Sequence, residues 1–79
     1  MVSLTVNDNG RHYRGNTWED LLTHLHKDQL VPERNDKSYM RAVARRVKMW
    51  NHVLIRTDTA EHFLRDLAEQ NLVVLDTVQ

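Results

Sequence analysis

The segment from Lys37 to Thr57 combines the strongest helical periodicity of the chain with its strongest charge bias. At about 100° per residue, its apolar side chains fall on one side of a helix and most of its cations on the other. The apolar side chains are Met40, Val43, Ala44, Val47 and Trp50, and the cations, which we call the basic ridge, are Lys37, Arg41, Arg45 and Lys48. No acid lies between Asp36 and Asp58. The pattern predicts an amphipathic helix that ends near Asn51, with an apolar face that the other elements must cover.

A β-hairpin is predicted near the N-terminus. Residues 3–6 alternate in the manner of a half-buried strand, and the Asn-Gly pair at 9–10 is the preferred sequence for a two-residue turn. Such a turn pairs Val6 with Tyr13. It also places these two residues and Leu4 on one face of the hairpin, which we expect to be the buried face.

Capping signals and apolar stripes predict two further helices. The candidate N-caps are Asn16 or Thr17 for the first helix, Asp36 or Ser38 for the basic helix and Asp58 for the last helix. The apolar stripes are Trp18, Leu21, Leu22 and Leu25 in the first helix, and Phe63, Leu64, Leu67 and Ala68 in the last. Asn71 suits a left-handed residue at the end of the last helix.

Two short strands complete the predicted fold. Branched residues at 53–56 indicate one strand, and residues 72–75 indicate the other. With the helix between them, these strands are expected to form a right-handed parallel crossover. The element order is then β-β-α-α-β-α-β, which belongs to the α+β class.

A chain of 79 residues has room for a single core, so residues 1–79 are expected to form one globular domain. The core is expected where the apolar faces of these elements meet. Its predicted members are Leu4, Val6, Tyr13, Trp18, Leu21, Leu22, Leu25, Val43, Val47, Trp50, Phe63, Leu64 and Leu67.

Signatures of catalysis and of metal binding are absent from the sequence. There is no cysteine, and His24 and His26, two residues apart, lie about 200° from each other on a helix. The histidines are therefore expected to be ordinary surface or boundary residues. Neither Ser3 nor Ser38 lies in a nucleophile elbow, and the two glycines form no phosphate-binding loop. The sequence predicts a non-enzymatic protein with no metal or other cofactor.

The chain contains no apolar run of membrane-spanning length, and its N-terminus lacks the apolar segment of a signal peptide. We therefore expect a cytoplasmic protein that does not associate with membranes.

The motifs, taken together, resemble those of a class of small uncharacterised proteins encoded by bacteriophages and prophages. The resemblance covers most of the chain: a strand hairpin, then WEDLL, YMRAVARRVKMW, IRTD and FLRDLAEQNLVVL. It implies a bacterial host cell and a role in acting on a host or phage component, such as modulating a bacterial protein. It implies no particular functional residue.

Two surfaces could carry a binding function. Met49 falls off the apolar stripe, about 100° from Trp50, and Arg46 lies at the edge of that stripe. An exposed apolar residue beside an arginine is typical of a protein interface, which makes Arg46 and Met49 candidate partner-binding residues. The basic ridge could instead follow the phosphates of a nucleic acid.

The protein-binding interpretation is favoured for three reasons. The charges of the whole chain cancel, and the ridge offers no Asn or Gln that could read base edges. The connection before the basic helix contains Pro32 and is longer than a helix-turn-helix turn. We therefore predict an unidentified protein partner, with a homodimer as one form, and nucleic acid as the alternative. A third interpretation is that the basic ridge has no binding function. Runs of charge on a helix commonly form a solvated face that is partly paired with acids of neighbouring elements.

Overall fold

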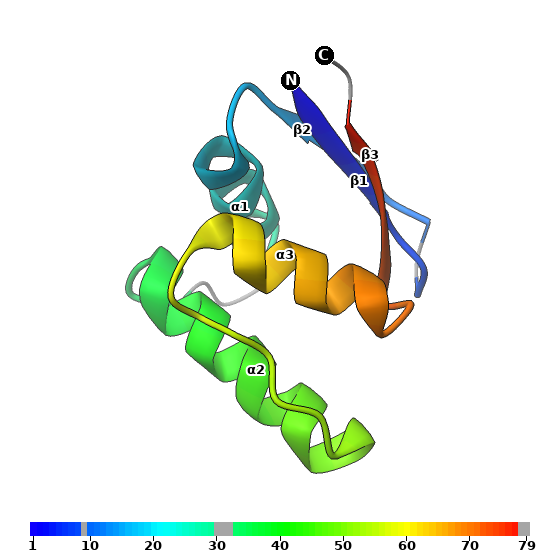
Figure 1. The fold of residues 1–79 in the computed structure, drawn as a ribbon. Helices are drawn as coiled ribbons and strands as arrows, with labels where there is room; N and C mark the ends of the chain where they lie inside the picture. Colours follow the sequence, from blue (N-terminus) through cyan, green and yellow to red (C-terminus); the bar gives the residue numbers. More distant parts are fainter. Residues whose placement is uncertain (9, 30–32, 78–79) are drawn as a thin grey trace.

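The computed structural model describes residues 1–8, 10–29 and 33–77. The chain forms strands β1 (Val2–Val6) and β2 (His12–Gly15), helices α1 (Trp18–Lys27), α2 (Asp36–Asn51) and α3 (Ala60–Glu69), and strand β3 (Val73–Thr77). The α+β class is confirmed, with the hairpin, the three helices and the last strand in the expected order. The helices lie on one side of the sheet (Figure 1).

β1 is the central strand of a three-stranded antiparallel sheet with the order β2-β1-β3. Leu4 lies opposite Tyr13 of β2 and opposite Leu75 of β3. The expected parallel crossover between residues 53–56 and 72–75 is wrong, because residues 53–56 form no strand and β3 pairs with β1, antiparallel to it. A tight turn explains this pairing. Asn71 adopts the predicted left-handed conformation (φ 59°), and the N–H of Leu72 donates to a carbonyl in the last turn of α3, which reverses the chain onto β1.

The hairpin is offset by two residues from the predicted register, because Tyr13 lies opposite Leu4 and not opposite Val6. Contacts outside the hairpin account for the offset: the backbone and side-chain N–H groups of Asn7 donate to carbonyls in the turn between α3 and β3. A shift of two residues leaves each side chain on its own face, so the face assignment is unchanged. The turn predicted at 9–10 lies partly outside the described residues.

The N-caps are Thr17 for α1, Asn35 for α2 and Thr59 for α3. The first was one of the two predicted, whereas Asp36 or Ser38 for α2 and Asp58 for α3 are wrong. These acids have partners in the tertiary structure. The hydroxyl of Thr23 in α1 donates to the carboxylate of Asp36 at 2.7 Å, and the carboxylate of Asp58 lies 3.0 Å from the ring of His62.

Residues 52–59, which we call the return segment, run back along α2 to the start of α3 (Figure 1). The strand predicted at 53–56 is not formed, and no described strand pairs with these residues. His52 ends α2 in the left-handed conformation (φ 57°), and Ile55 is buried in the core. The hydrophobic residues in the return segment therefore pack against helices and do not extend the sheet.

Arg56 and Asp66 form a charged clamp between the return segment and α3. The backbone N–H and Nε of Arg56 donate to one carboxylate oxygen of Asp66 at 2.9 and 3.0 Å, and Nη2 donates to the other at 2.9 Å. These hydrogen bonds hold the pKa of the Asp66 carboxyl below its ordinary value of 3.8, against the opposing effect of burial. Because the clamp uses the backbone N–H of Arg56, that donor is not available to a sheet.

We expect Asp66→Asn to lower the free energy of unfolding at neutral pH by about 1–2 kcal/mol, because it removes the ion pair while keeping the shape. The contribution of the pair also depends on pH. As pH falls below about 4, the unfolded chain takes up this proton before the folded chain does, so the contribution is lost as pH falls toward the folded pKa. Urea denaturation between about pH 7 and pH 3 should show a shallower loss of stability in the variant. Parallel curves for the two proteins would contradict the assignment.

The core lies between the sheet and helices α1 and α3, with α2 as an outer layer (Figure 1). The predicted core residues that are buried are Leu4, Leu21, Leu22, Leu25, Val47, Phe63, Leu64 and Leu67. Those that are partly buried against the core are Val6, Tyr13, Trp18 and Val43. Buried residues that were not predicted are Val2, Tyr39, Met40, Ile55, Ala60 and Val73.

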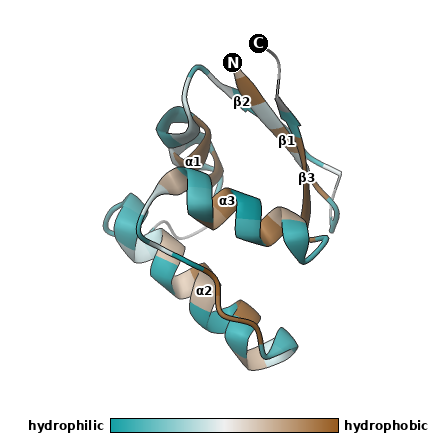
Figure 2. Cartoon of the chain, in the orientation of Figure 1, coloured by the Kyte–Doolittle hydropathy of each residue, from teal (hydrophilic) through white to brown (hydrophobic). Residues whose placement is uncertain are grey.

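Trp50 was predicted in the core, and this prediction is wrong, because its side chain is 73% exposed. Helix length explains the difference. α2 has 16 residues, whereas α1 and α3 have 10 each. At 1.5 Å per residue, α2 is about 9 Å longer than the helices that cover its apolar face, so its last turns extend beyond them. Figure 2 shows the hydrophobic part of the return segment beside this end of α2.

Candidate functional site

Three large apolar side chains are exposed where α2 ends and the return segment begins, and we call them the apolar tip. Met49 is 67% exposed, Trp50 73% and Leu54 77%. The first two belong to the last turn of α2, and Leu54 follows within three residues of the end of that helix. Elsewhere in the described chain, the exposed large hydrophobics are Met1 and Val74, of which Val74 lies on the outer face of the sheet. Large exposed apolar side chains concentrated in one short stretch are typical of interaction surfaces.

A groove of about 290 Å³ adjoins the apolar tip. Tyr39, Val43, Arg46 and Trp50 line it from α2, at positions within about 60° of each other around the helix. The other lining residues are Val6, Asp8, Gln29, Val47, Asn51 and Leu72. Val6 and Leu72 lie at the end of the sheet, so the groove separates α2 from the β1 and β3 strands. Its mainly apolar lining suits an apolar side chain of another molecule.

The structure places the two predicted partner-binding residues at this surface. Arg46 is exposed and lines the groove, and Met49 belongs to the apolar tip. Sequence reasoning missed Trp50 and Leu54. A signal for Leu54 was present, because an extended segment alternates its side chains, and Leu54 is exposed next to buried Ile55. The exposure of Trp50 depends on how far the neighbouring helices extend along α2, and the sequence contained no signal of that.

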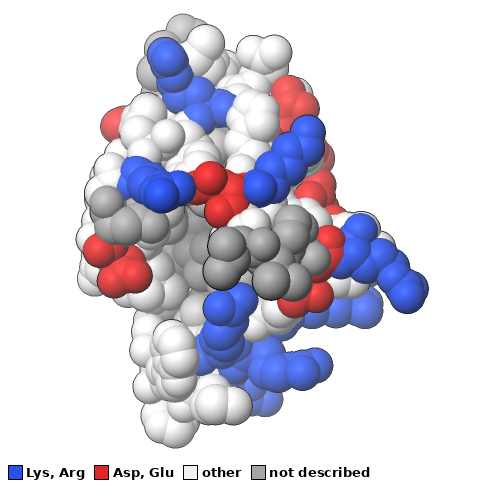
Figure 3. Space-filling view, turned by 180° about the vertical axis from the view of Figure 1, so that it is seen from behind, with Lys and Arg blue, Asp and Glu red and all other residues white. Residues whose placement is uncertain are grey.

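All four residues of the basic ridge are exposed, and none of them forms an ion pair with a described acid. The same holds for Arg46. The arginines that do form such pairs are Arg11, Arg56 and Arg65, with Asp28, Asp66 and Glu61. The partial pairing with neighbouring acids that was considered for the ridge is thus not found among the described residues. Figure 3 shows lysine and arginine side chains gathered on the lower part of the molecule beside an uncharged surface.

Zero net charge conceals a strong separation of charge along the chain. Six of the eleven lysines and arginines lie between Lys37 and Thr57, and none of the eleven acids does. The rest of the chain consequently carries an excess of acids. The surface of α2 therefore presents a positive potential, although the whole protein is neutral.

A buried histidine, which sequence reasoning placed at the surface or boundary, joins α1 to the start of α2. The Nδ1 atom of His26 lies 2.9 Å from the Asp36 carboxylate, and Nε2 lies 2.9 Å from the carbonyl oxygen of Glu33. The ring stacks on Tyr39 with 5.0 Å between centroids. Burial opposes ionisation of Asp36, but hydrogen bonds from Thr23 and His26 outweigh it and lower the pKa of this carboxyl. The cluster positions the N-terminal end of α2.

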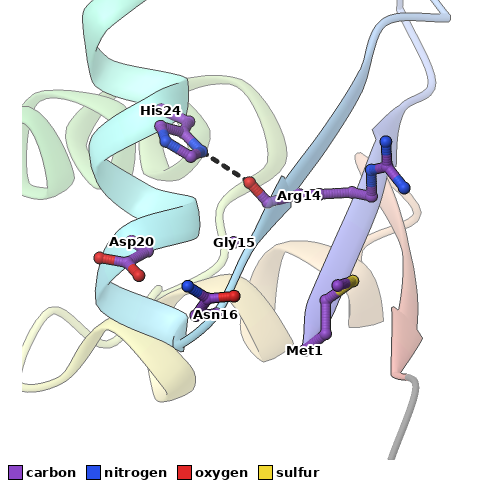
Figure 4. A pocket seen from close by; sticks show the side chains of 6 residues that line it. All are labelled: Met1, Arg14, Gly15, Asn16, Asp20 and His24. Atoms are coloured by element: carbon purple, nitrogen blue, oxygen red, sulfur yellow. Dashed lines mark hydrogen bonds between the residues drawn. The ribbon is translucent and has the colours of Figure 1, made fainter.

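A second hollow, of about 350 Å³, lies between β2 and the start of α1 (Figure 4). Its lining residues are Met1, Arg14, Gly15, Asn16, Asp20 and His24. The Nδ1 atom of His24 lies 2.6 Å from the carbonyl oxygen of Arg14 and donates to it, and Figure 4 shows Asp20 and His24 pointing in different directions. The titratable groups of this hollow therefore do not converge on one point, as an acid–base pair must.

Within residues 1–8, 10–29 and 33–77, no three His, Asp or Glu side chains are grouped in a way that could hold a metal ion. No helix in these ranges has the length and apolar character needed to cross a membrane. Comparison with protein-family models, with curated proteins and with solved structures finds no match to the chain.

Proposed function

We propose that the chain is a small, non-enzymatic protein-binding module that engages its partner through the apolar tip and Arg46. The observation that carries this proposal is the exposure of Met49, Trp50 and Leu54 at one end of α2. The sequence resemblance described above supports a setting for this module: the cytoplasm of a bacterial host cell, where it would act as a phage-encoded modulator of a bacterial protein.

Large apolar side chains in water favour association. Transferring a large apolar side chain from water into an interface contributes about 1.5–3 kcal/mol. The tip offers Met49, Trp50 and Leu54 without using them in the core. Tryptophan and arginine are also the residues most often found at the energetic centre of protein interfaces, and Trp50 and Arg46 line the same groove.

We expect the double variant Met49→Ser with Trp50→Ser to lose partner capture by about thirtyfold or more, the effect of removing a central interface residue. The measurement uses the immobilised chain in nuclease-treated bacterial lysate, with the captured proteins quantified by mass spectrometry. Because both side chains are exposed, the variant should unfold at the temperature of the parent.

Val74→Ser provides the matched control. Val74 is 52% exposed and lies on the outer face of the sheet, so the same kind of change is made away from α2. Capture should survive in this control. Capture that disappears on nuclease treatment, or that is equally reduced by Val74→Ser, would refute the proposal.

Nucleic-acid binding is the second candidate, and it is favoured by the cations of the basic ridge, which form no ion pair with any acid in the described part of the chain. If it were correct, Arg41→Glu with Arg45→Glu would abolish binding to random-sequence duplex DNA. The logarithm of the parent's affinity would also fall by about 0.9 per phosphate contact for each tenfold increase in salt. Under our proposal the parent shows no such micromolar, salt-dependent binding, and the double reversal mainly slows association with the protein partner.

A further inference from the structure

We infer that the partner presents an acidic segment carrying large apolar side chains, which bind at the apolar tip and groove while its carboxylates face the cations of α2. This inference rests on the proposed function and specifies the chemistry of the partner. The charge around the apolar surface is the basis. Arg45 lies one helical turn before Met49, and Arg46 one turn before Trp50. Each apolar anchor on the helix therefore has an arginine beside it.

These arginines are available to a partner. All cations of α2 are exposed, and none forms an ion pair with a described acid. A basic partner would set its cations against Arg45 and Arg46, and like charges at an interface suppress binding by several kcal/mol. A neutral apolar partner would use the tip but leave these charges without partners. An acidic amphipathic segment satisfies both the apolar and the charged parts of the surface.

A second copy of this chain is a poorer occupant. A two-fold interface uses the same patch on both molecules, so α2 would face α2. After Asp36 this helix contains cations and no acid, and the two copies would oppose like charges around Met49 and Trp50. A nucleic acid is also poorer, because its phosphates would meet the cations but leave the apolar tip uncovered.

The test uses synthetic peptides of about 18 residues, long enough for two turns of apolar anchors at helical spacing. The first peptide carries Leu and Phe anchors with Glu at the remaining positions. The second replaces each Glu by Lys, and the third keeps Glu and replaces each anchor by Ser. A random-sequence DNA duplex is the fourth probe. Binding is followed by the fluorescence of Trp50 in a chain carrying Trp18→Phe, so that a blue shift reports burial of the tip.

We expect the first peptide to bind. The affinity of the second and third peptides should be lower by a factor of about thirty or more. Arg45→Glu with Arg46→Glu should weaken the first peptide about tenfold or more. The control reversal, Arg14→Glu with Arg34→Glu, changes the net charge equally at exposed sites away from the tip and should have a much smaller effect. Raising the salt concentration should reduce affinity for the first peptide only partly, because the apolar contacts persist.

Four results would overturn the inference. The Lys peptide binding as tightly as the Glu peptide would show that charge does not select the partner. Tighter binding of DNA that survives Met49→Ser with Trp50→Ser, followed by the anisotropy of a dye on the duplex because this variant lacks Trp50, would assign the surface to nucleic acid. A dimer in sedimentation that Trp50→Ser converts to a monomer would assign it to a second copy. If the Glu peptide fails to bind while lysate capture still depends on Met49 and Trp50, this inference fails and the proposed function stands.

Discussion

Phe63→Ala is expected to lower the free energy of unfolding by about 3–5 kcal/mol, the usual cost of removing a buried phenyl ring. Phe63 has no exposed surface. Its ring and that of Tyr39 pack edge to face with 6.3 Å between centroids, which connects α3 to the outer helix α2. A domain of this length has about 4–12 kcal/mol of stability in total. The loss is therefore about a quarter or more of the total, so the variant should unfold at a clearly lower urea concentration than the parent.

Urea denaturation followed by circular dichroism measures this loss. Val74→Ala is the control, because Val74 is half-exposed on the outer face of the sheet, and its change should stay within about 0.5 kcal/mol. If Phe63→Ala kept the midpoint of the parent, the packing of α3 between the sheet and α2 would have to be wrong.

Gly15→Ala is expected to cost about 3 kcal/mol, at the upper end of the range for overpacking. A Cβ atom at Gly15 would lie 2.6 Å from the backbone nitrogen of Leu21 and 3.0 Å from the carbonyl carbon of Asp20. These are backbone atoms of the first turns of α1, so no side-chain rotation can relieve the contact. Either β2 or α1 must move, and both are needed to cover the core.

Gly10→Asn separates this steric effect from the general effect of replacing a glycine. Gly10 has a positive φ of 72°, and a Cβ there would meet no atom within 4 Å. Asparagine tolerates this backbone conformation better than other side chains, so the loss should be about 1 kcal/mol or less. Thermal unfolding of the two variants compares them directly. Equal shifts in Tm would mean that crowding at Gly15 is not the cause.

Local patterns were sufficient for the three helices, for the hairpin and last strand, and for most inward faces. Leu21 and Leu64 are buried where the helical period places them, and Thr17 caps α1 as its sequence position suggests. The period of two in a strand kept Leu4 and Tyr13 on the inner face even though their register was off by two residues. Such predictions succeed because they depend on residues within one turn or one strand.

The candidate site was predicted in part. The angular position of Met49 and Arg46 on a helix indicated surface residues beside an apolar stripe, and both are exposed. Trp50 lies on the apolar stripe, so the same reasoning placed it in the core. The absence of acids from α2 after Asp36 was visible in the sequence, but whether acids from other elements would approach its cations was not. In the structure no described acid forms an ion pair with the ridge, although Glu33 lines a hollow together with Arg41 and Arg45.

The sequence by itself determined the helices, the strand faces and the concentration of positive charge on α2, because each follows from spacing along the chain. Only the tertiary structure decided that residues 53–56 form no strand, since the clamp between Arg56 and Asp66 uses a backbone donor that a sheet would need. It alone decided that β3 pairs with β1, and that Trp50 lies in solvent. Each of these outcomes depends on contacts between elements that are far apart in the sequence. The apolar stripe of a helix, for example, has the same period whether the neighbouring helix has ten residues or sixteen, so it does not show which of its residues are covered.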